Sequence, residues 1–194
     1  MNRKKQFTLA MICFGFAMVS SALGDRTPAV PSVSFMEHTY RLVSFNQKTQ
    51  PTWEFTSNHE TAADWTTKFT IIDRSDLHTS ADLESISAGM KSDAESRGGK
   101  VLVSTSMRDD NGKMFPYTVI GFDQPAQHRF ELDFVKAAIG SKNAYVAVYC
   151  VRITDEKDYV NKTKMYLHTH SSAVGTALSA ATLPDIAKLP RTEF

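Results

Sequence analysis

The sequence has only two cysteines, Cys13 and Cys150, and Cys13 falls inside an apolar run near the start of the chain. If the first 24 residues are removed, Cys150 is the only cysteine left and no internal disulfide can form. This excludes the small toxins and growth factors whose folds depend on disulfides. Cys150 itself lies in the apolar run VAVYCVR, where we expect it to be a buried, inert side chain.

Familiar catalytic motifs are also missing. The sequence has no GxSxG elbow, no HExxH, no CxxC, no glycine-rich phosphate loop and no EF-hand pattern. We therefore expect no catalytic residue and no cofactor. An excess of one charge is missing as well, because loss of residues 1–24 changes 22 basic and 21 acidic residues to 19 and 21, a net charge of −2. We expect no nucleic-acid partner, since this balance gives no general attraction to nucleic acid.

The N-terminus contains the three parts of an export signal. Three basic residues at positions 3 to 5 precede an apolar run over residues 7–19, and the small residues SSALG follow. The run is shorter than the roughly 20 residues of a membrane-spanning helix, so a cleaved signal peptide is favoured over an anchor. We predict a signal peptide over residues 1–24, cleavage near Gly24/Asp25, a periplasmic or secreted protein, and no integral membrane span after cleavage.

The rest of the chain has the length of one domain. Residues 25–35 contain two prolines and no periodicity, which indicates an extended leader. Residues 36–182 are predicted as a single α+β domain, and residues 183–194 as a C-terminal tail. No internal repeat or linker divides the domain.

Strand patterns dominate this domain. In RFELDFVKAAIG, Phe130, Leu132 and Phe134 alternate with Glu131 and Asp133, the period of a half-buried strand. The Asn-Gly pair at 111–112 favours a hairpin between two other strand-like runs. The predicted strands are HTYRLVSFN, TWEFT, WTTKFTIIDR, KVLVSTSMR, KMFPYTVIGF, RFELDFVKAAIG and AYVAVYCVRI.

Helical spacing appears in two longer segments. Leu83, Ile86 and Met90 fall on one side of an amphipathic helix over about residues 80–97. Val160 and Val174 belong to a seven-residue recurrence that favours a C-terminal helix over residues 158–181. A strand over KMYLHTH is the alternative for that segment.

A third, short helix is predicted at SNHETAADW, with Ser57 or Asn58 as its cap. Runs of strands with helices segregated from them indicate an α+β fold, in which an antiparallel sheet built from hairpins is packed by the amphipathic helix and the C-terminal helix.

The order of these elements, together with AADWTTKFTII and AYVAVYCVRI, resembles the PsbP/Mog1-like fold over roughly Tyr40 to Ala181. Many exported bacterial proteins of unassigned function look similar. The resemblance implies a scaffold or binding role, and it supplies no catalytic residues because most members of this class are binding and assembly factors.

Five side chains are candidates for a site. His168 and His170 would point to one side of a strand and share a metal, but would point apart on a helix, so the helix prediction favours no metal site. Tyr117, Tyr145 and Tyr149 lie on hairpin strands and are candidates to line a ligand groove between sheet and helix. Core packing explains these tyrosines equally well.

These observations favour a non-enzymatic periplasmic binding or assembly protein whose partner is another envelope protein. Two alternatives stay open: an exported hydrolase or metal-dependent enzyme using His168 or His170, and a small-molecule carrier with a groove between sheet and helix.

Overall fold

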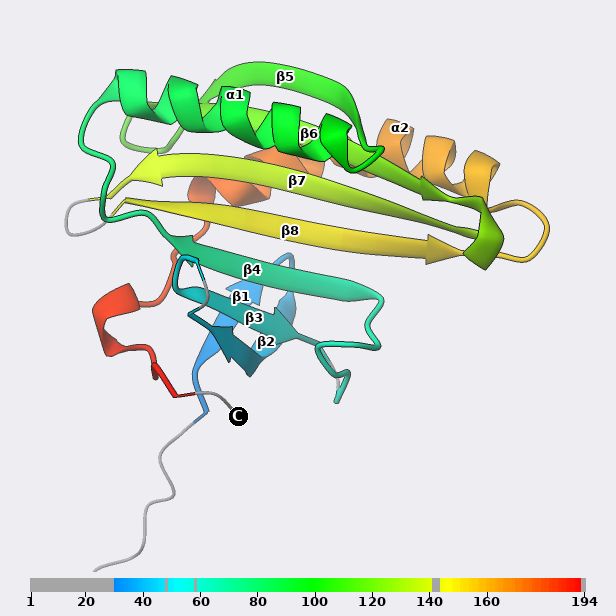
Figure 1. Ribbon diagram of the computed structural model, residues 1–194, viewed down its shortest axis with the longest axis horizontal. Helices are drawn as coiled ribbons and strands as arrows, with labels where there is room; N and C mark the ends of the chain where they lie inside the picture. Colours follow the sequence, from blue (N-terminus) through cyan, green and yellow to red (C-terminus); the bar gives the residue numbers. More distant parts are fainter. Residues whose placement is uncertain (1–29, 48, 58, 141–143, 193–194) are drawn as a thin grey trace, which may run out of the picture.

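Eight strands form one antiparallel sheet, with helix α1 (Ser80–Ser96) on one face and helix α2 (Tyr159–Ala180) on the other (Figure 1). The computed structural model describes residues 30–47, 49–57, 59–140 and 144–192, and the expected signal peptide and its cleavage site lie outside them. The strands are β1 (Ser32–Phe35), β2 (His38–Asn46), β3 (Thr52–Thr56), β4 (Thr67–Asp73), β5 (Lys100–Arg108), β6 (Met114–Gln124), β7 (Arg129–Ile139) and β8 (Ala144–Thr154). The predicted α+β class with an antiparallel sheet packed by helices is confirmed.

The sheet consists of two meanders that meet in its middle. In space the strands run β1-β2-β3-β4-β8-β7-β6-β5, so β4 pairs with β8 although they are far apart in sequence. This pairing extends from Thr67 opposite Val151 to Asp73 opposite Tyr145. Every other contact between neighbouring strands joins elements that follow one another along the chain.

Alternation along the strands produces two cores. The larger core, on the α2 side, contains Phe69, Phe134 and Leu178 of α2. The smaller core, on the α1 side, contains Val148 and Leu83 of α1. Because neighbouring residues of a strand point to opposite faces, β6, β7 and β8 each contribute to both cores.

Helix α1 confirms the prediction over residues 80–97. Thr79 caps its first turn: the Thr79 side chain accepts from the backbone of Asp82, and the Asp82 carboxylate accepts from the backbone of Thr79. The chain leaves the helix through Gly98, whose φ of +81° suits glycine.

Helix α2 confirms the helical interpretation of residues 158–181 and excludes a strand at KMYLHTH. It approaches the sheet closely at Gly175, where a Cβ atom would lie 3.2 Å from the sulfur of Met107 and 3.3 Å from the ring of Tyr117. The absence of a side chain at Gly175 therefore allows α2 to lie against β5 and β6.

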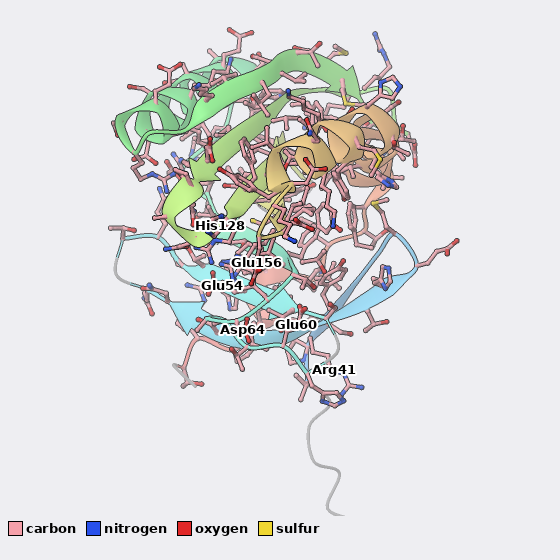
Figure 2. All side chains as sticks on the ribbon, turned by 90° about the vertical axis from the view of Figure 1, so that its right-hand side faces the viewer. Arg41, Glu54, Glu60, Asp64, His128 and Glu156 are labelled. Carbon is pink, nitrogen blue, oxygen red and sulfur yellow. The ribbon has the colours of Figure 1, made fainter. Side chains whose placement is uncertain are left out.

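The predicted short helix at SNHETAADW is wrong, because the described residues of that segment form a loop. The Glu60 carboxylate, instead of favouring a helix terminus, accepts hydrogen bonds from the backbone and hydroxyl of Thr66 and from the Ser57 hydroxyl. Local side-chain hydrogen bonds of this kind compete with helix formation. Figure 2 shows this loop, with Glu60 and Asp64, at one end of the sheet.

Both ends of the described chain pack onto the sheet. β1 lies within the segment expected as an extended leader, so the sheet begins before Met36, where we expected the domain to start. After α2, a short 3-10 helix η2 (Ile186–Lys188) buries Ile186, and the Trp53 indole donates to the carbonyl oxygen of Pro190 at 2.7 Å. The segment expected as a tail thus covers the β3 part of the α2-side core.

Candidate functional site

Helix α1 covers only part of its face of the sheet. It packs on β5, β6 and β7, while β8, β4 and β3 continue beyond it with no helix of the described chain in front of them (Figure 1). We call this uncovered region the open face and define it by Glu54 of β3, Lys68 of β4, Cys150 of β8, and Glu131 and Asp133 of β7. Its position follows from having one helix on this face of a sheet of eight strands.

The strand register brings three chemically different side chains into one row. Asp133 lies opposite Cys150, and Cys150 lies opposite Lys68 on its other side. Side chains directly opposite one another on antiparallel strands have Cβ atoms about 5 Å apart. A carboxyl, a thiol and an amine therefore stand side by side across β7, β8 and β4.

Asp133 is the least satisfied group in this row. Its Oδ1 is inaccessible to solvent and has no hydrogen-bond partner in the part of the chain that the structure describes. Burial raises the pKa of Asp133 to about 6, and the charge of Glu131 adds to this rise. Contact with Cys150 and the charges of Lys68 and Arg97 oppose the rise without cancelling it.

Ion pairs fix the other polar side chains of the open face. The Lys68 amine lies 2.7 Å from a carboxylate oxygen of Glu54 and 4.7 Å from the centre of the Trp65 ring. The Arg152 guanidinium lies 3.9 Å from the same ring and 3.7 Å from Glu131. Trp65 is therefore buried under two cations, as expected of a packing anchor and not of a free stacking surface.

A hollow of about 390 Å³ lies over the open face. Apolar side chains, among them Met90 and Val148, form part of its lining, and Glu54, Lys68 and Asp133 add polar groups. An apolar lining with a few convergent polar groups is the usual composition of a binding site. The volume lies within the range of pockets that hold small ligands or inserted side chains.

Cys150 lines the same hollow but is poorly suited to be a nucleophile. Burial, followed by the negative charge of Asp133, raises the pKa of its thiol well above the ordinary value. The reactive form of cysteine is the thiolate, which this setting disfavours. The structure therefore places Cys150 as the buried strand residue that its sequence context predicts.

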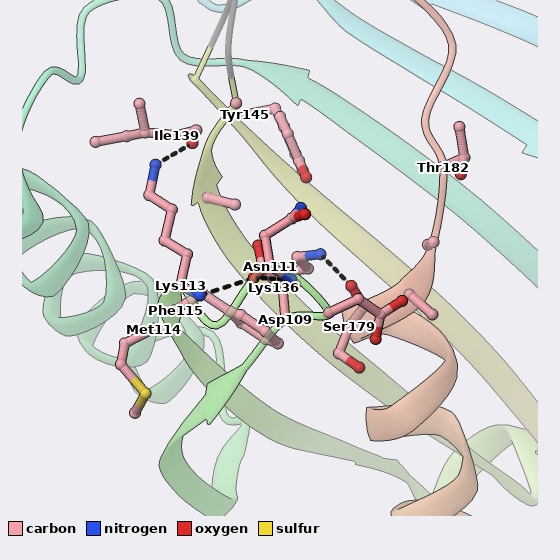
Figure 3. Close-up of a pocket in the computed structure, with 15 residues that line it drawn as sticks. Asp109, Asn111, Lys113, Met114, Phe115, Lys136, Ile139, Tyr145, Ser179 and Thr182 are labelled. Carbon is pink, nitrogen blue, oxygen red and sulfur yellow. Dashed lines mark hydrogen bonds between the residues drawn. The ribbon is translucent and has the colours of Figure 1, made fainter.

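A second hollow, of about 400 Å³, lies at the C-terminal end of α2 (Figure 3). The amine of Lys136, a residue only 4% exposed, donates to the carbonyl oxygens of Leu178 and Ser179 at 2.8 and 3.1 Å. Helix carbonyls at this end lack intrahelical partners and attract cations. Lys136 thus stabilises the end of α2, and burial lowers its pKa.

The three tyrosines proposed for a groove all lie on the α2 side of the sheet, in different settings. Tyr145 lines the hollow at the end of α2. Tyr117 and Tyr149 are buried in the core beneath the helix, and the Tyr117 hydroxyl donates to the carbonyl oxygen of Ser171 at 3.3 Å. Burial raises the pKa of both buried phenols.

His168 and His170 are both exposed on α2. Two positions along a helix correspond to a rotation of about 200°, so the two rings leave the helix on opposite sides. The His170 ring lies beside that of Tyr166, with the ring centres 4.6 Å apart. Among the described residues, no group of three or more histidine, cysteine or acidic side chains is arranged to hold a metal, and no helix is long and apolar enough to span a membrane.

The sequence patterns do not single out the two most unusual side chains, Asp133 and Lys136. Asp133 was assigned only to the polar side of its strand. Lys136 carried a signal that could have revealed it, because it has the same parity as the core residues Leu132 and Phe134 and therefore had to point into the core.

Comparison with models of protein families finds no family that matches this chain, and comparison with curated proteins finds no matching relative.

Proposed function

We propose that the protein is exported and is a non-enzymatic binding protein that acts on another component of the cell envelope through its open face. The observation that supports this proposal is the buried, unpaired Oδ1 of Asp133 on the hollow of that face. Buried polar atoms in native proteins are nearly always hydrogen-bonded, and an unpaired one costs about 1–3 kcal/mol. A hydrogen-bond donor from a partner would remove this cost.

The charges around the hollow indicate the kind of partner surface. Four acidic and three basic side chains line the hollow, so it has no strong preference for one sign of charge: Glu54, Asp93, Glu131 and Asp133, and Lys68, Arg74 and Arg97. Its polar groups include both donors and acceptors, and its base is apolar. These features suit a polar segment of another envelope protein that inserts a donor toward Asp133.

The settings of Cys150, His168 and His170 argue against the enzymatic alternative. The Cys150 thiol is held in its protonated form, and His168 and His170 lie on separate sides of α2, away from any shared substrate position. The PsbP/Mog1-like resemblance supports a binding role, and residues 1–24 support export, as parts of the same proposal.

A photo-crosslinking amino acid placed on the open face would test the proposal in cells. We choose positions Gln50 and Met90, which line the hollow without taking part in its ion pairs, and Thr169, which is exposed on α2, as the control. A discrete adduct from Gln50 and Met90 but not from Thr169 is the expected result. Cell fractionation of the same strains should show a periplasmic protein whose mass corresponds to a start at Asp25.

Asp133 provides the second arm of this experiment. The leucine in Asp133→Leu has a similar branched shape but cannot accept a hydrogen bond, so this variant should greatly reduce the adduct. Glu84→Gln, at an exposed position of α1, should leave the adduct unchanged. Circular dichroism verifies that each variant is folded, and Asp133→Ala, which also has no side-chain acceptor, replaces the leucine variant if it is not. Equal labelling from Thr169, no adduct from either hollow position, or an adduct unaffected by the loss of Asp133 would each contradict the proposal.

A further inference from the structure

The strand β5 forms one edge of the sheet and lacks the usual protection of such an edge. Within the described chain it pairs only with β6, and it is nine residues long, whereas the opposite edge strand β1 has four residues. Natural edge strands are commonly short, or interrupted by charges or prolines, because unpaired backbone groups recruit other strands. Residues 101–107, with the sequence VLVSTSM, contain no charge, proline or glycine.

The edge is also accessible over most of its length. Every residue from 102 to 106 is exposed, including Leu102 at 40% and Val103 at 38%. The single irregularity in its pairing with β6 lies between Val101 and Val103, and the ladder continues regularly from there to Arg108. Helices α1 and α2 contact β5 from the two faces of the sheet and leave its outer edge uncovered.

We propose that β5 pairs antiparallel with β5 of a second copy of this chain, about a two-fold axis at Thr105. In this register Val103 faces Met107 of the other copy, Ser104 faces Ser106, and Thr105 faces itself. Hydroxyl pairs and apolar pairs directly opposite one another stabilise antiparallel strands. The two eight-stranded sheets would then continue as one.

Charge complementarity selects both the occupant and the register. With the axis at Thr105, the exposed Lys100 at the start of β5 comes to the end of the pairing at which the turn after the other copy's β5 carries the exposed Asp110, and symmetry repeats this proximity at the far end. With the axis one residue earlier, at Ser104, Lys100 would face Arg108 twice, and like charges directly opposite destabilise a strand pair. The sequence of the edge is therefore complementary to itself in one register.

Variants with one introduced surface cysteine test this register directly. Cys150 is buried, so an introduced surface cysteine reports on its own surroundings. Under mild oxidation Thr105→Cys should give roughly tenfold more disulfide-linked dimer than Ser104→Cys, because only directly facing residues meet disulfide geometry. A mixture of Ser104→Cys and Ser106→Cys should give the mixed dimer, and Thr169→Cys on exposed α2 should give none.

Light scattering after gel filtration gives the independent measurement. The unmodified chain should elute as a dimer at high concentration, and Thr105→Lys should elute as a monomer with an unchanged circular dichroism spectrum, since two like charges would face each other across the axis. A monomeric unmodified chain, a dimer that survives Thr105→Lys, or preferential crosslinking at Ser104 would each overturn the proposal. If the chain is a monomer and the backbone amides of β5 become protected from hydrogen exchange only when another protein is bound, the β5 edge pairs with a strand of that protein and not with a second copy. These results do not depend on the open face, whose crosslinks are measured separately.

Discussion

Replacement of Asp133 by asparagine should stabilise the protein, and the gain should depend on pH. Folding raises the pKa of this carboxyl from 3.8 to about 6, because the side chain is buried without a partner for Oδ1. Between these two values the folded chain binds more protons than the unfolded chain. Stability therefore falls as the pH rises through this window, and the loss is complete above pH 6.

The magnitude follows from the two pKa values. A difference of one pKa unit corresponds to about 1.4 kcal/mol, so ionisation of Asp133 destabilises the folded chain by about 3 kcal/mol at pH 7.5. Asparagine has nearly the same shape and no charge. Because its amide also needs partners, we expect Asp133→Asn to raise the free energy of unfolding by about 2 kcal/mol at pH 7.5, and to leave it nearly unchanged at pH 4.

Urea unfolding followed by tryptophan fluorescence suits this measurement, since Trp53 and Trp65 are both buried. The quantity to compare is the difference in the free energy of unfolding between Asp133→Asn and the parent at pH 4, 5, 6 and 7.5. Other titrating groups contribute equally to both proteins and cancel in this difference. Asp155 is an example: the hydrogen bond from Lys162 lowers its pKa to about 2, so its contribution to stability is lost as the pH falls, in variant and parent alike. Glu84→Gln, on the exposed side of α1, is the matched control and should show no such trend.

If Asp133→Asn raises the free energy of unfolding equally at pH 4 and pH 7.5, the electrostatic reasoning is refuted, because the gain would have to arise from packing. Destabilisation at pH 7.5 would show that the Asp133 carboxylate is satisfied in the folded chain. In either case the unpaired oxygen would no longer support a binding site on the open face.

Two further predictions concern the other buried polar groups. Lys136→Met should lower the free energy of unfolding by about 2 kcal/mol, because it leaves two carbonyl groups at the end of α2 without a donor. Lys164→Met, at an exposed position of the same helix, should leave the free energy of unfolding unchanged. Equal urea midpoints for the two variants would contradict this role of Lys136. The Cys150 thiol, buried and with a raised pKa, should not react with a colorimetric thiol reagent at pH 8 until urea unfolds the chain, and rapid reaction in the native state would show that it is accessible.

The sequence was sufficient for most of the fold because its periodic signals are local. Leu83 and Ala94 lie on a stripe that one helix must bury, and Leu132 and Phe134 alternate with polar residues as a strand requires. β1 alternates strictly, with Val33 and Phe35 buried, but over only four residues after a proline, too few to distinguish a strand from an extended leader. SNHETAADW has the composition of a helix start, but its described residues form a loop in which Glu60 bonds to Thr66 and Ser57.

The candidate site was harder to predict because it depends on pairing between distant strands. Nothing near Asp133 in the sequence indicates that Cys150 and Lys68 will lie beside it, since that arrangement requires the β7–β8 and β4–β8 registers together. The tyrosines illustrate the opposite case. Their positions on strands were clear, but which of them α2 would cover depended on the close approach at Gly175.

The β4–β8 pairing also determines when folding can finish. Residues 32–73, which contain β1 to β4, precede residues 144–154 along the chain and emerge long before them when the chain is delivered from its N-terminus. Until then β4 has one unpaired edge, and Phe69 and Ile71, which are fully buried in the finished fold, lack their partners Tyr149 and Ala147 on β8. Joining strands this far apart in sequence is slow because a long loop must close first. Any chain that stops short of β8 therefore has two half sheets and lacks the strand that unites them.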